Sequence, residues 1–371
     1  MRDVTRLFFE LIQISLGNKK KFERLPSEEE WQTLFTLAEK QALTSLLLLG
    51  LDRALSQPGA TKPSVVLEWI GAQQITESQN RLQNERAKQL TNLFAKNGFR
   101  SCVLKGQGTA LYYDKPEYRQ CGDIDIWVTD GEGVKVNDSR CRDAILGFVR
   151  SKGLHIGHVD IKHSDIDFFK DVPVEVHFLP SWMYCPSTNR LLQKFFDEKA
   201  ESQFANLDEK FGFAHTTIDF DLVYSMVHIY RHIFSEGIGL RQLVDYFYIL
   251  QRSTEEQRLE AFNVLCQLKM KAFVGGIMWI MMECFGMNIK YSLCPVNERH
   301  GRFLLSEIMT AGSFGHFDDR TKQVSKDKKF KRGFVQLGRN LRFVSYYPSE
   351  VLWSPFWKLW HWCWRKKKGY L

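Results

Sequence analysis

The sequence predicts an α+β fold in which a small mixed β-sheet core is flanked by N-terminal and C-terminal helical regions. Apolar residues recur at helical spacing before residue 97 and again after residue 219. Between them, from Phe99 onward, short apolar segments alternate with polar residues and are separated by turn-forming residues. At 371 residues, the chain is long enough for two or three domains of ordinary size.

The first 97 residues are expected to form a helical region. Leu, Phe and Ile recur at helical spacing through 4–56, and "PSEEEW" supplies a helix start in which Ser27 caps and Glu30 sits three residues later. A Pro- and Gly-containing loop follows at 56–64. Residues 65–97 then predict one long, polar-rich helix, because the glycine that follows is a natural helix stop.

The region 98–215 is expected to be the α+β core. The segments "FRSCVL", "DIDIWV", "SDIDFF" and "VPVEVHF" read as strands. "GTALYY" predicts a helical turn or short helix, and "NDSRCRDAILGFVRSKG" predicts a longer helix. A tight turn between the last two strands indicates that they pair with each other.

A helical domain is predicted at 216–312, where "DLVYSMVHIYRHIF" and "GLRQLVDYFYIL" have helical periodicity. Residues 313–371 follow as a basic loop and a Trp-rich amphipathic tail helix, which we expect to start at Ser354-Pro355. Four indoles recur on one helical face, at Trp353, Trp357, Trp360 and Trp364. Three interpretations of this face stay open: packing onto the body, contact with a membrane or protein partner, and contact with nucleic acid.

Charge and cysteine content exclude several classes of protein. The formal net charge is +8, but residues 320–371 hold fourteen Lys and Arg against two acidic residues, which gives +12 there and −4 for residues 1–319. This distribution argues against a uniformly basic nucleic-acid-binding surface, although it allows a local basic patch. Eight cysteines without a C-x-x-C pair argue against a disulfide framework and a structural zinc site.

The expected location is the cytoplasm. The N-terminus lacks the small-residue cleavage site of a secretory signal, and no apolar run approaches the roughly 18 residues of a membrane-spanning helix. The tail helix makes a peripheral position at the inner face of the membrane a second expected location.

Asp123 and Asp125 are the strongest candidates for a metal site. Side chains alternate along a strand, so both carboxylates project to the same side, where we expect an exposed edge. Two neighbouring carboxylates repel unless a cation lies between them, and Mg²⁺ prefers oxygen ligands. Glu175 in "VPVEVHF" would complete the site if its strand lies alongside. The second pair, Asp165 and Asp167, lacks the same surroundings, and we interpret it as exposed hairpin charges.

Residues before the aspartates point to phosphate binding. Lys105, Gly106 and Gly108 precede a short helix, so an ammonium group and backbone amides are available for phosphate oxygens. Arg119, four residues before Asp123, adds a forked donor. One acidic residue beside an Asp-x-Asp pair is the arrangement that a two-metal phosphoryl-transfer site needs.

The order of these segments resembles the nucleotidyltransferase superfamily typified by DNA polymerase beta. It is most similar to the bacterial uncharacterised nucleotidyltransferase family, to which abortive-infection nucleotidyltransferases are related. The matching segments are Leu104-Lys105-Gly106, Arg119-Gln120-Cys121-Gly122-Asp123-Ile124-Asp125 and Val174-Glu175-Val176-His177. A further match is the Gly-Ile-Gly-Leu-Arg-Gln-Leu-x-Asp segment at 237–245, and the resemblance spans about residues 30–320.

The resemblance implies roles for three further residues. Arg241 is implied as a phosphate or substrate contact, although an ion pair with Asp245 on the same helix is the simpler interpretation. His163 is implied as a substrate contact. His177 shares a strand face with Glu175, so it is expected either to orient a carboxylate or substrate, or to be an ordinary hydrogen-bonded histidine.

The predicted function is metal-dependent nucleotidyl transfer. Asp123, Asp125 and Glu175 would hold two Mg²⁺ ions, with Mn²⁺ as a substitute, and an NTP would donate its nucleoside monophosphate. The acceptor is an unidentified hydroxyl or phosphate, with surface-polysaccharide biosynthesis as one setting that the resemblance implies. The alternatives are a nucleotidyltransferase toxin that modifies tRNA and a catalytically inactive nucleotide-binding or scaffold protein of the same fold.

Overall fold

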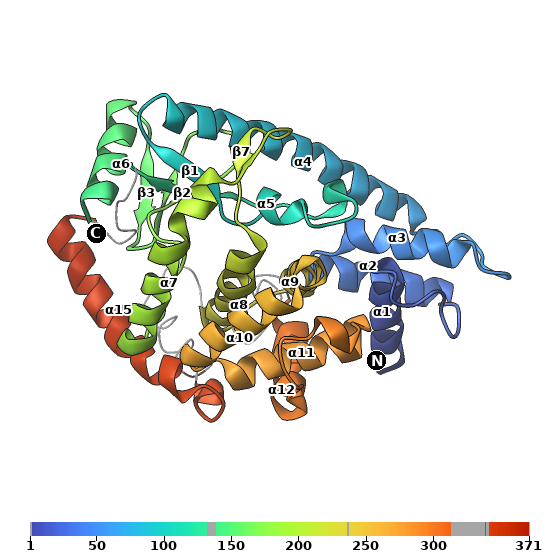
Figure 1. The fold of residues 1–371 in the computed structure, drawn as a ribbon. Helices are drawn as coiled ribbons and strands as arrows, with labels where there is room; N and C mark the ends of the chain where they lie inside the picture. Colours follow the sequence, from blue (N-terminus) through green and yellow to red (C-terminus); the bar gives the residue numbers. More distant parts are fainter. Residues whose placement is uncertain (1, 132–138, 236, 313–337, 339–340, 371) are drawn as a thin grey trace.

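The computed structural model describes residues 2–131, 139–235, 237–312, 338 and 341–370. Figure 1 shows a small sheet at one end of the molecule, the long helix α4 running across it, and a body of helices below. No helix in these ranges has the length and apolar character that a transmembrane segment requires. The basic loop predicted within 313–337 lies outside the described residues.

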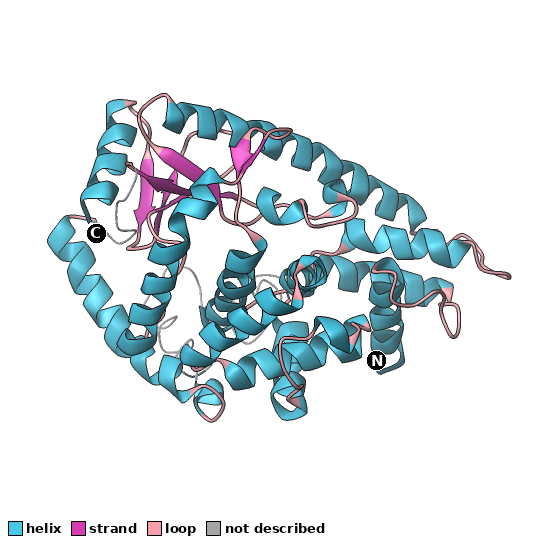
Figure 2. Cartoon of the chain, viewed as in Figure 1, coloured by secondary structure: helices cyan, strands magenta, loops and turns pink. Residues whose placement is uncertain are grey.

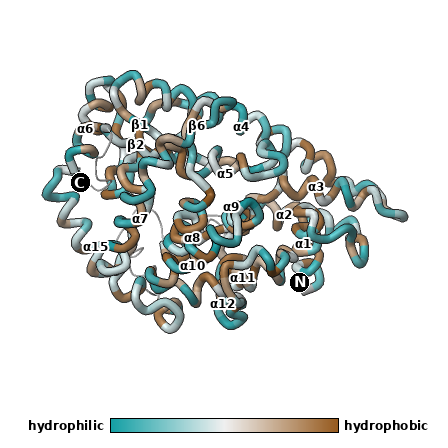
Figure 3. The backbone as a smooth tube through the Cα atoms, in the orientation of Figure 1, coloured by the Kyte–Doolittle hydropathy of each residue, from teal (hydrophilic) through white to brown (hydrophobic). Residues whose placement is uncertain are grey.

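The N-terminal region is helical, as predicted. Its helices are α1 (Arg2–Ser15), α2 (Glu28–Lys40), α3 (Thr44–Leu55) and α4 (Val66–Ala95). The predicted capping box is confirmed: the Glu30 amide donates to Ser27 Oγ at 3.3 Å, and the Ser27 amide donates to Glu30 Oε2 at 2.8 Å. The long helix expected at 65–97 is α4, which is hydrophilic along most of its length (Figure 3).

The predicted mixed sheet is confirmed. Its strands are β1 (Arg100–Val103), β2 (Ile124–Thr129), β3 (Ile156–Val159), β4 (His163–Ile166) and β5 (Val174–His177). They lie in the order β1-β2-β5-β4-β3, and β2 and β5 are parallel while the other neighbours are antiparallel. Figure 2 shows this sheet enclosed by helices. The edge strand β3 was not predicted, because His155, Gly157 and His158 interrupt the apolar pattern there.

Two layers of helices cover the sheet. Ile124, Ile126 and Val128 of β2 pack in an apolar core with side chains from α4 and from α6 (Ser139–Ser151). On the opposite face, the Trp127 ring lies 4.7 Å from Phe204 of α7 (Pro186–Ala205) and 6.1 Å from Phe220 of α8 (Ile218–Ser235). The face of β2 that carries Asp125 is therefore covered by helices.

The helices that follow α8 form the body of the molecule. They are α9 (Leu240–Arg252), α10 (Glu255–Gln267), α11 (Lys271–Phe285) and α12 (Glu298–Ala311). Their apolar side chains share one core with those of α1 and α3. The close approach of α11 and α12 requires a glycine, because a Cβ atom at Gly301 would lie 2.4 Å from the Trp279 ring. The division of the chain into the four segments 1–97, 98–215, 216–312 and 313–371 stays a prediction.

Short elements connect the larger ones. They are α5 (Gln107–Ala110), the 3₁₀ helices η1 (Pro116–Tyr118) and η2 (Ile289–Tyr291), and the hairpin of β6 (Leu207–Asp208) and β7 (Phe213–Ala214). The short helix predicted from "GTALYY" is confirmed as α5 and the turn after it.

The tail helix α15 (Pro348–Lys368) begins six residues earlier than the sequence indicated. The predicted start at Ser354-Pro355 is wrong, and Pro355 lies inside the helix. The cause is tertiary: Tyr347 and Val351 are buried in the body, and the buried Glu350 carboxylate accepts hydrogen bonds from the Tyr184 amide at 2.8 and 3.1 Å. Packing onto the body therefore fixes the first turn of α15.

Candidate active site

Three carboxylates meet where β2 and β5 run side by side. Asp125 on β2 lies opposite Glu175 on β5 in the parallel register, and Asp123 immediately precedes β2. One oxygen from each of the three carboxylates lies within 4.8 Å of the others. The expectation of an exposed edge is wrong for Asp125, which is 2% exposed, because α8 and α9 cover this part of the strand.

Two cations contact the buried Asp125. Lys105 Nζ lies 3.0 Å from Asp125 Oδ1, and His177 Nε2 lies 3.0 Å from the same oxygen. Burial would lower the pKa of Lys105, but the charges of Asp125, Asp123 and Glu175 outweigh it and raise that pKa. Burial also opposes the charged form of His177, yet its hydrogen bonds to Asp125 and Glu175 raise the pKa to about 9. The chain itself neutralises part of the acidic cluster.

His163 and Glu175 form the other side of the cluster. His163 Nδ1 lies 3.6 Å from Glu175 Oε2, and the His163 and His177 ring centroids are 5.2 Å apart. Burial, followed by the charges of Lys162 and His177, lowers the pKa of His163 to about 4. Burial would raise the pKa of Glu175, but the His177 hydrogen bond and neighbouring cations lower it to about 2. Both histidines predicted as substrate contacts thus adjoin the carboxylates.

The donor set fits a divalent cation. Two ligands on opposite sides of a Mg²⁺ ion lie about 4.2 Å apart, since each Mg–O bond is about 2.1 Å. The 4.8 Å limit that encloses oxygens of Asp123, Asp125 and Glu175 is compatible with such an ion after small side-chain adjustments. These three residues could therefore bind a divalent metal, and the contact of Lys105 with Asp125 shows that a positive charge is accommodated there.

A narrow pocket adjoins the carboxylates. Lys105, Gly106, Arg119 and Arg241 line it together with Asp123 and Asp125, so the structure brings most of the predicted phosphate contacts to one place. Gly106 has a φ of +63°, a backbone conformation that favours glycine.

Gly108 does not line this pocket, and its environment indicates a packing role. A Cβ atom at Gly108 would lie 3.0 Å from the His215 Cβ atom and 3.2 Å from the Val103 carbonyl oxygen. The glycine therefore lets α5 approach β1 and the segment before α8 closely.

Arg119 forms a buried ion pair. Its Nε and Nη2 atoms donate to Asp245 Oδ1 and Oδ2 at 2.8 and 2.9 Å, and the Tyr113 hydroxyl donates to Asp245 Oδ1 at 2.6 Å. Arg241 Nη1 donates to the Gln120 carbonyl oxygen at 2.6 Å. The sequence paired Asp245 with Arg241 on the same helix and missed its bidentate contact with Arg119. Both arginines hold the segment that leads to Asp123 against α9.

Helix α4 supports the same segment through buried amides that the sequence reasoning missed. Asn80 Nδ2 donates to the Arg119 carbonyl oxygen at 2.9 Å, and Gln83 Nε2 donates to the Gly122 carbonyl oxygen. Both side chains are buried. Polar residues at helical spacing along α4 were the available signal: Gln73, Thr76, Asn80 and Gln83 form a buried polar stripe.

Comparison with protein families identifies a match over most of the chain. The family model described as "Uncharacterised nucleotidyltransferase" matches residues 27–286, which include every residue of the acidic cluster and of the adjoining pocket. A search of curated proteins found no match.

Proposed function

The chain belongs to the uncharacterised nucleotidyltransferase family, and from this premise we propose that it transfers a nucleoside monophosphate from an NTP to an acceptor hydroxyl or phosphate. The acceptor oxygen attacks the α-phosphorus, the bond to the β-phosphate oxygen breaks, and pyrophosphate leaves with the electron pair. Glu175 orients a hydroxyl acceptor and takes its proton. The observation that carries the proposal is the convergence of Asp123, Asp125 and Glu175 within 4.8 Å.

Asp123, Asp125 and Glu175 would hold the metal, which we propose to be two Mg²⁺ ions with Mn²⁺ as a substitute. When bound, the ions would lower the pKa of an attacking hydroxyl and neutralise charge on the departing pyrophosphate. The chain prepares this site by holding Asp125 between Lys105 and His177 in a fixed position.

The neighbouring cations are proposed to bind the triphosphate. Lys105 would turn from Asp125 to a phosphate oxygen, because a metal at the carboxylates would replace its charge there. Arg119 Nη1 is buried and has no hydrogen-bond partner among the described residues, although Nε and Nη2 are held by Asp245. Arg241 and the Gly106 backbone line the same pocket and complete the proposed phosphate site.

The location and the acceptor are further parts of the proposal. We place the reaction in the cytoplasm, at the inner face of a membrane, because α15 ends in four cations beside exposed apolar residues. Surface-polysaccharide biosynthesis is the proposed setting. Addition of nucleotide to tRNA and a catalytically inactive scaffold are the alternative outcomes of the test.

The test is nucleotide labelling with the full-length chain. Each α-³²P-labelled NTP is incubated with the protein, Mg²⁺ or Mn²⁺ and a cell extract, and labelled products are separated and identified. Metal-dependent label on a glycan or sugar phosphate supports the proposal. Label on RNA identifies the tRNA alternative, and the absence of label with every NTP and extract overturns nucleotidyl transfer in favour of the scaffold.

A further inference from the structure

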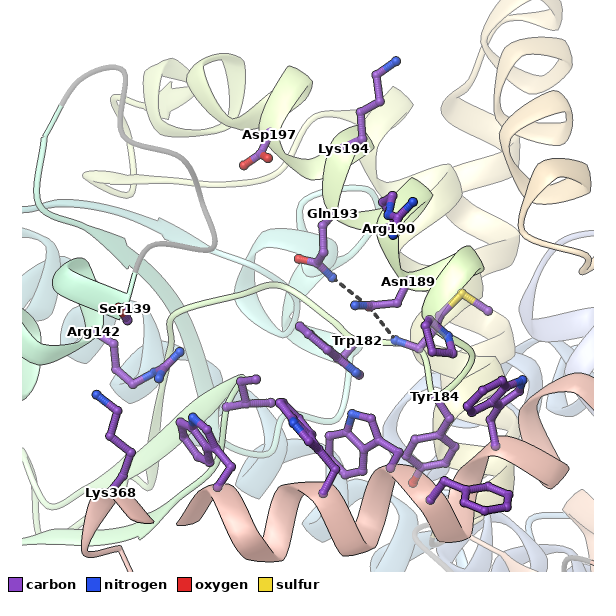
Figure 4. Close-up of a pocket in the computed structure, with 18 of the residues that line it drawn as sticks. Ser139, Arg142, Trp182, Tyr184, Asn189, Arg190, Gln193, Lys194, Asp197 and Lys368 are labelled. Carbon is purple, nitrogen blue, oxygen red and sulfur yellow. Dashed lines mark hydrogen bonds between the residues drawn. The ribbon is translucent and has the colours of Figure 1, made fainter. Parts of the chain in front are cut away.

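A wide groove lies between α15 and α7, apart from the acidic pocket. It has a volume of about 1780 Å³ and is also bordered by the start of α6 and by the segment from Trp182 to Tyr184. In Figure 4, ring side chains rise from α15 toward Trp182 and Tyr184, while residues of α7 form the opposite wall. Cavities of this size are large enough for a small-molecule ligand.

The groove is held open by contacts at both ends of α15. Near its start, the buried Glu350 accepts from the Tyr184 amide and lies 3.5 Å from Arg231 Nη1. Near its end, His361 Nε2 lies 3.2 Å from Asp160 Oδ1 in the turn between β3 and β4. The groove is therefore preformed, and a ligand would not have to order α15.

Several rings at the floor of the groove lie nearly parallel to a neighbouring ring. Trp360 stacks on Trp182 with an interplanar angle of 9°, and Trp357 stacks on His361 with an angle of 14°. His361 in turn stacks on Trp364 with an angle of 16°. Bases of single-stranded nucleic acids bind by stacking on free aromatic faces, and each of these near-parallel pairs turns part of a ring surface toward its neighbour instead. A flexible apolar chain needs no free ring face and can pack along the row of rings.

The charge of the groove favours an anionic ligand. Among the described residues that line it, the cations are Arg140, Arg142, Arg190, Lys194 and Lys368, against the carboxylates of Asp130 and Asp197. Figure 4 places Arg142 and Lys368 close together at one end of the row of rings. Lys368 Nζ also lies 3.5 Å from Asp143 Oδ2 at the exposed surface, and the Arg142 guanidinium lies over the Trp364 ring. The groove thus combines an apolar floor with an end that holds two cations, one of them shared with a carboxylate.

Three buried donors of the lining have no acceptor among the described residues. They are the indole Nε1 groups of Trp182 and Trp357 and the Nε group of Arg142. An unsatisfied buried donor destabilises the fold, so a ligand oxygen that reaches these groups would remove a penalty present in the free protein.

Apolar side chains continue from the groove onto the outer surface of α15. Leu352, Phe356 and Leu359 are all more than half exposed. Exposed apolar residues next to a basic helix end are typical of segments that contact a lipid surface.

We propose that this groove binds one anionic membrane phospholipid, with its phosphate at Arg142 and Lys368 and an acyl chain along the row of α15 rings. The lipid holds the protein at the membrane surface. This proposal does not depend on nucleotidyl transfer, because no residue of the groove belongs to the acidic pocket.

The test uses dodecyl phosphate, below its micelle-forming concentration, as a soluble probe in calorimetric titrations of the full-length protein. Inorganic phosphate supplies the head without the chain, and dodecyl maltoside supplies the chain without the phosphate. Dodecyl phosphate is expected to bind at least about tenfold more tightly than either one. Comparable affinity for inorganic phosphate or for the maltoside overturns the proposal.

Matched variants separate the groove from the outer surface of α15. Trp360 lines the groove and is 46% exposed, whereas Trp362 is 50% exposed and does not line it. Trp360→Glu is expected to weaken dodecyl phosphate binding at least about tenfold, and Trp362→Glu to change it less than about twofold. Because both side chains are substantially exposed, neither change should prevent folding.

Lys368→Glu and Lys367→Glu provide the same comparison for the charge, since Lys368 lines the groove and its exposed neighbour does not. In vesicle sedimentation, Trp360→Glu and Lys368→Glu should reduce binding more than Trp362→Glu and Lys367→Glu do. Phosphatidylglycerol vesicles, which are anionic, should bind more protein than phosphatidylcholine vesicles. Equal effects within each pair, or tighter binding of a single-stranded oligonucleotide that Trp360→Glu abolishes, overturn the proposal. Asp125→Asn should leave lipid binding unchanged, so failure of one proposal is distinguishable from failure of the other.

Discussion

The acidic pocket, beside Asp123 and Asp125, and the α15 groove, between α15 and α7, differ in whether their buried polar groups have partners within the protein. In the pocket, charged groups find partners on distant elements: Lys105 and His177 contact Asp125, and Arg119 contacts Asp245. In the groove, indole N–H groups are buried without an acceptor in the part of the chain that the structure describes, and among its described lining residues cations outnumber carboxylates. The difference teaches that the main charges of the pocket are already paired within the chain, whereas the groove keeps an excess of cations beside indole groups that find no acceptor among the described residues.

The largest expected effect comes from breaking the acidic cluster. Asp125→Asn keeps the shape of the side chain but removes the charge that would bind the metal, so nucleotidyl transfer should fall by on the order of 10³-fold. Pyrophosphate release in the presence of an identified acceptor measures it. Asp167→Asn is the matched control, because Asp167 belongs to the second Asp-Ile-Asp segment and is paired with His155 at the exposed surface. Equal activity of both variants and the unmodified protein would exclude the metal assignment.

The second prediction tests whether the partnered charges also stabilise the fold. Arg119→Met leaves Asp245 buried without its bidentate partner, so the free energy of unfolding should fall by about 3–5 kcal/mol. Urea denaturation followed by circular dichroism measures this change. Arg81→Met removes an exposed pair with Glu77 on α4 and should cost less than about 1 kcal/mol. Similar losses in the two variants would show that the buried pair contributes no more than a surface one.

These contrasts also separate what the sequence could predict from what it could not. Strand alternation predicted which side of each strand carries Asp125 and Glu175, since local periodicity decides which face a side chain takes. The prediction depended on the two strands lying side by side, which the parallel register of β2 and β5 confirms. The Arg119–Asp245 pair joins residues 126 positions apart, and no local pattern encodes such a contact. The nearer neighbour Arg241 was the better choice on helical spacing alone.

The tail shows the same limit. The spacing of Trp353, Trp357, Trp360 and Trp364 predicted a helix with an aromatic face, and that helix is present. The groove depends on how α15 docks against Trp182 and the start of α7, which is decided by the buried contacts of Glu350. A sequence pattern identifies which residues share one face of a helix, but not the surface against which that face packs.

A third prediction compares two buried carboxyl groups. Asp245 has a cation partner, and although burial would raise its pKa, Arg119 lowers it. Asp221 has no cation partner among the described residues, and burial raises its pKa to about 7 despite hydrogen bonds from Thr216 and Tyr112. Since an unfolded aspartate has a pKa of about 3.9, the folded protein binds a proton more tightly and loses stability as the pH rises from about 4 to about 7.

Asp221→Asn removes this titration. Between pH 5 and pH 8, the unmodified protein should lose about 3 kcal/mol more of its unfolding free energy than the variant does. Urea denaturation at the two pH values measures the difference. An identical pH dependence of the two proteins would indicate that Asp221 ionises in the folded protein as readily as in the unfolded one.

The smallest expected effect on stability belongs to the groove. Trp182→Phe keeps an aromatic ring opposite Trp360 and removes an N–H group that has no acceptor among the described residues. Loss of ring contact is offset by loss of the unsatisfied donor, so the free energy of unfolding should change by less than about 1 kcal/mol. Arg119→Met in the acidic pocket removes a bidentate ion pair with Asp245 and should cost several times more. If Trp182→Phe lowered the free energy of unfolding by more than about 3 kcal/mol, the indole would be making strong contacts within the folded protein. The groove would then resemble the acidic pocket in having its polar groups already partnered.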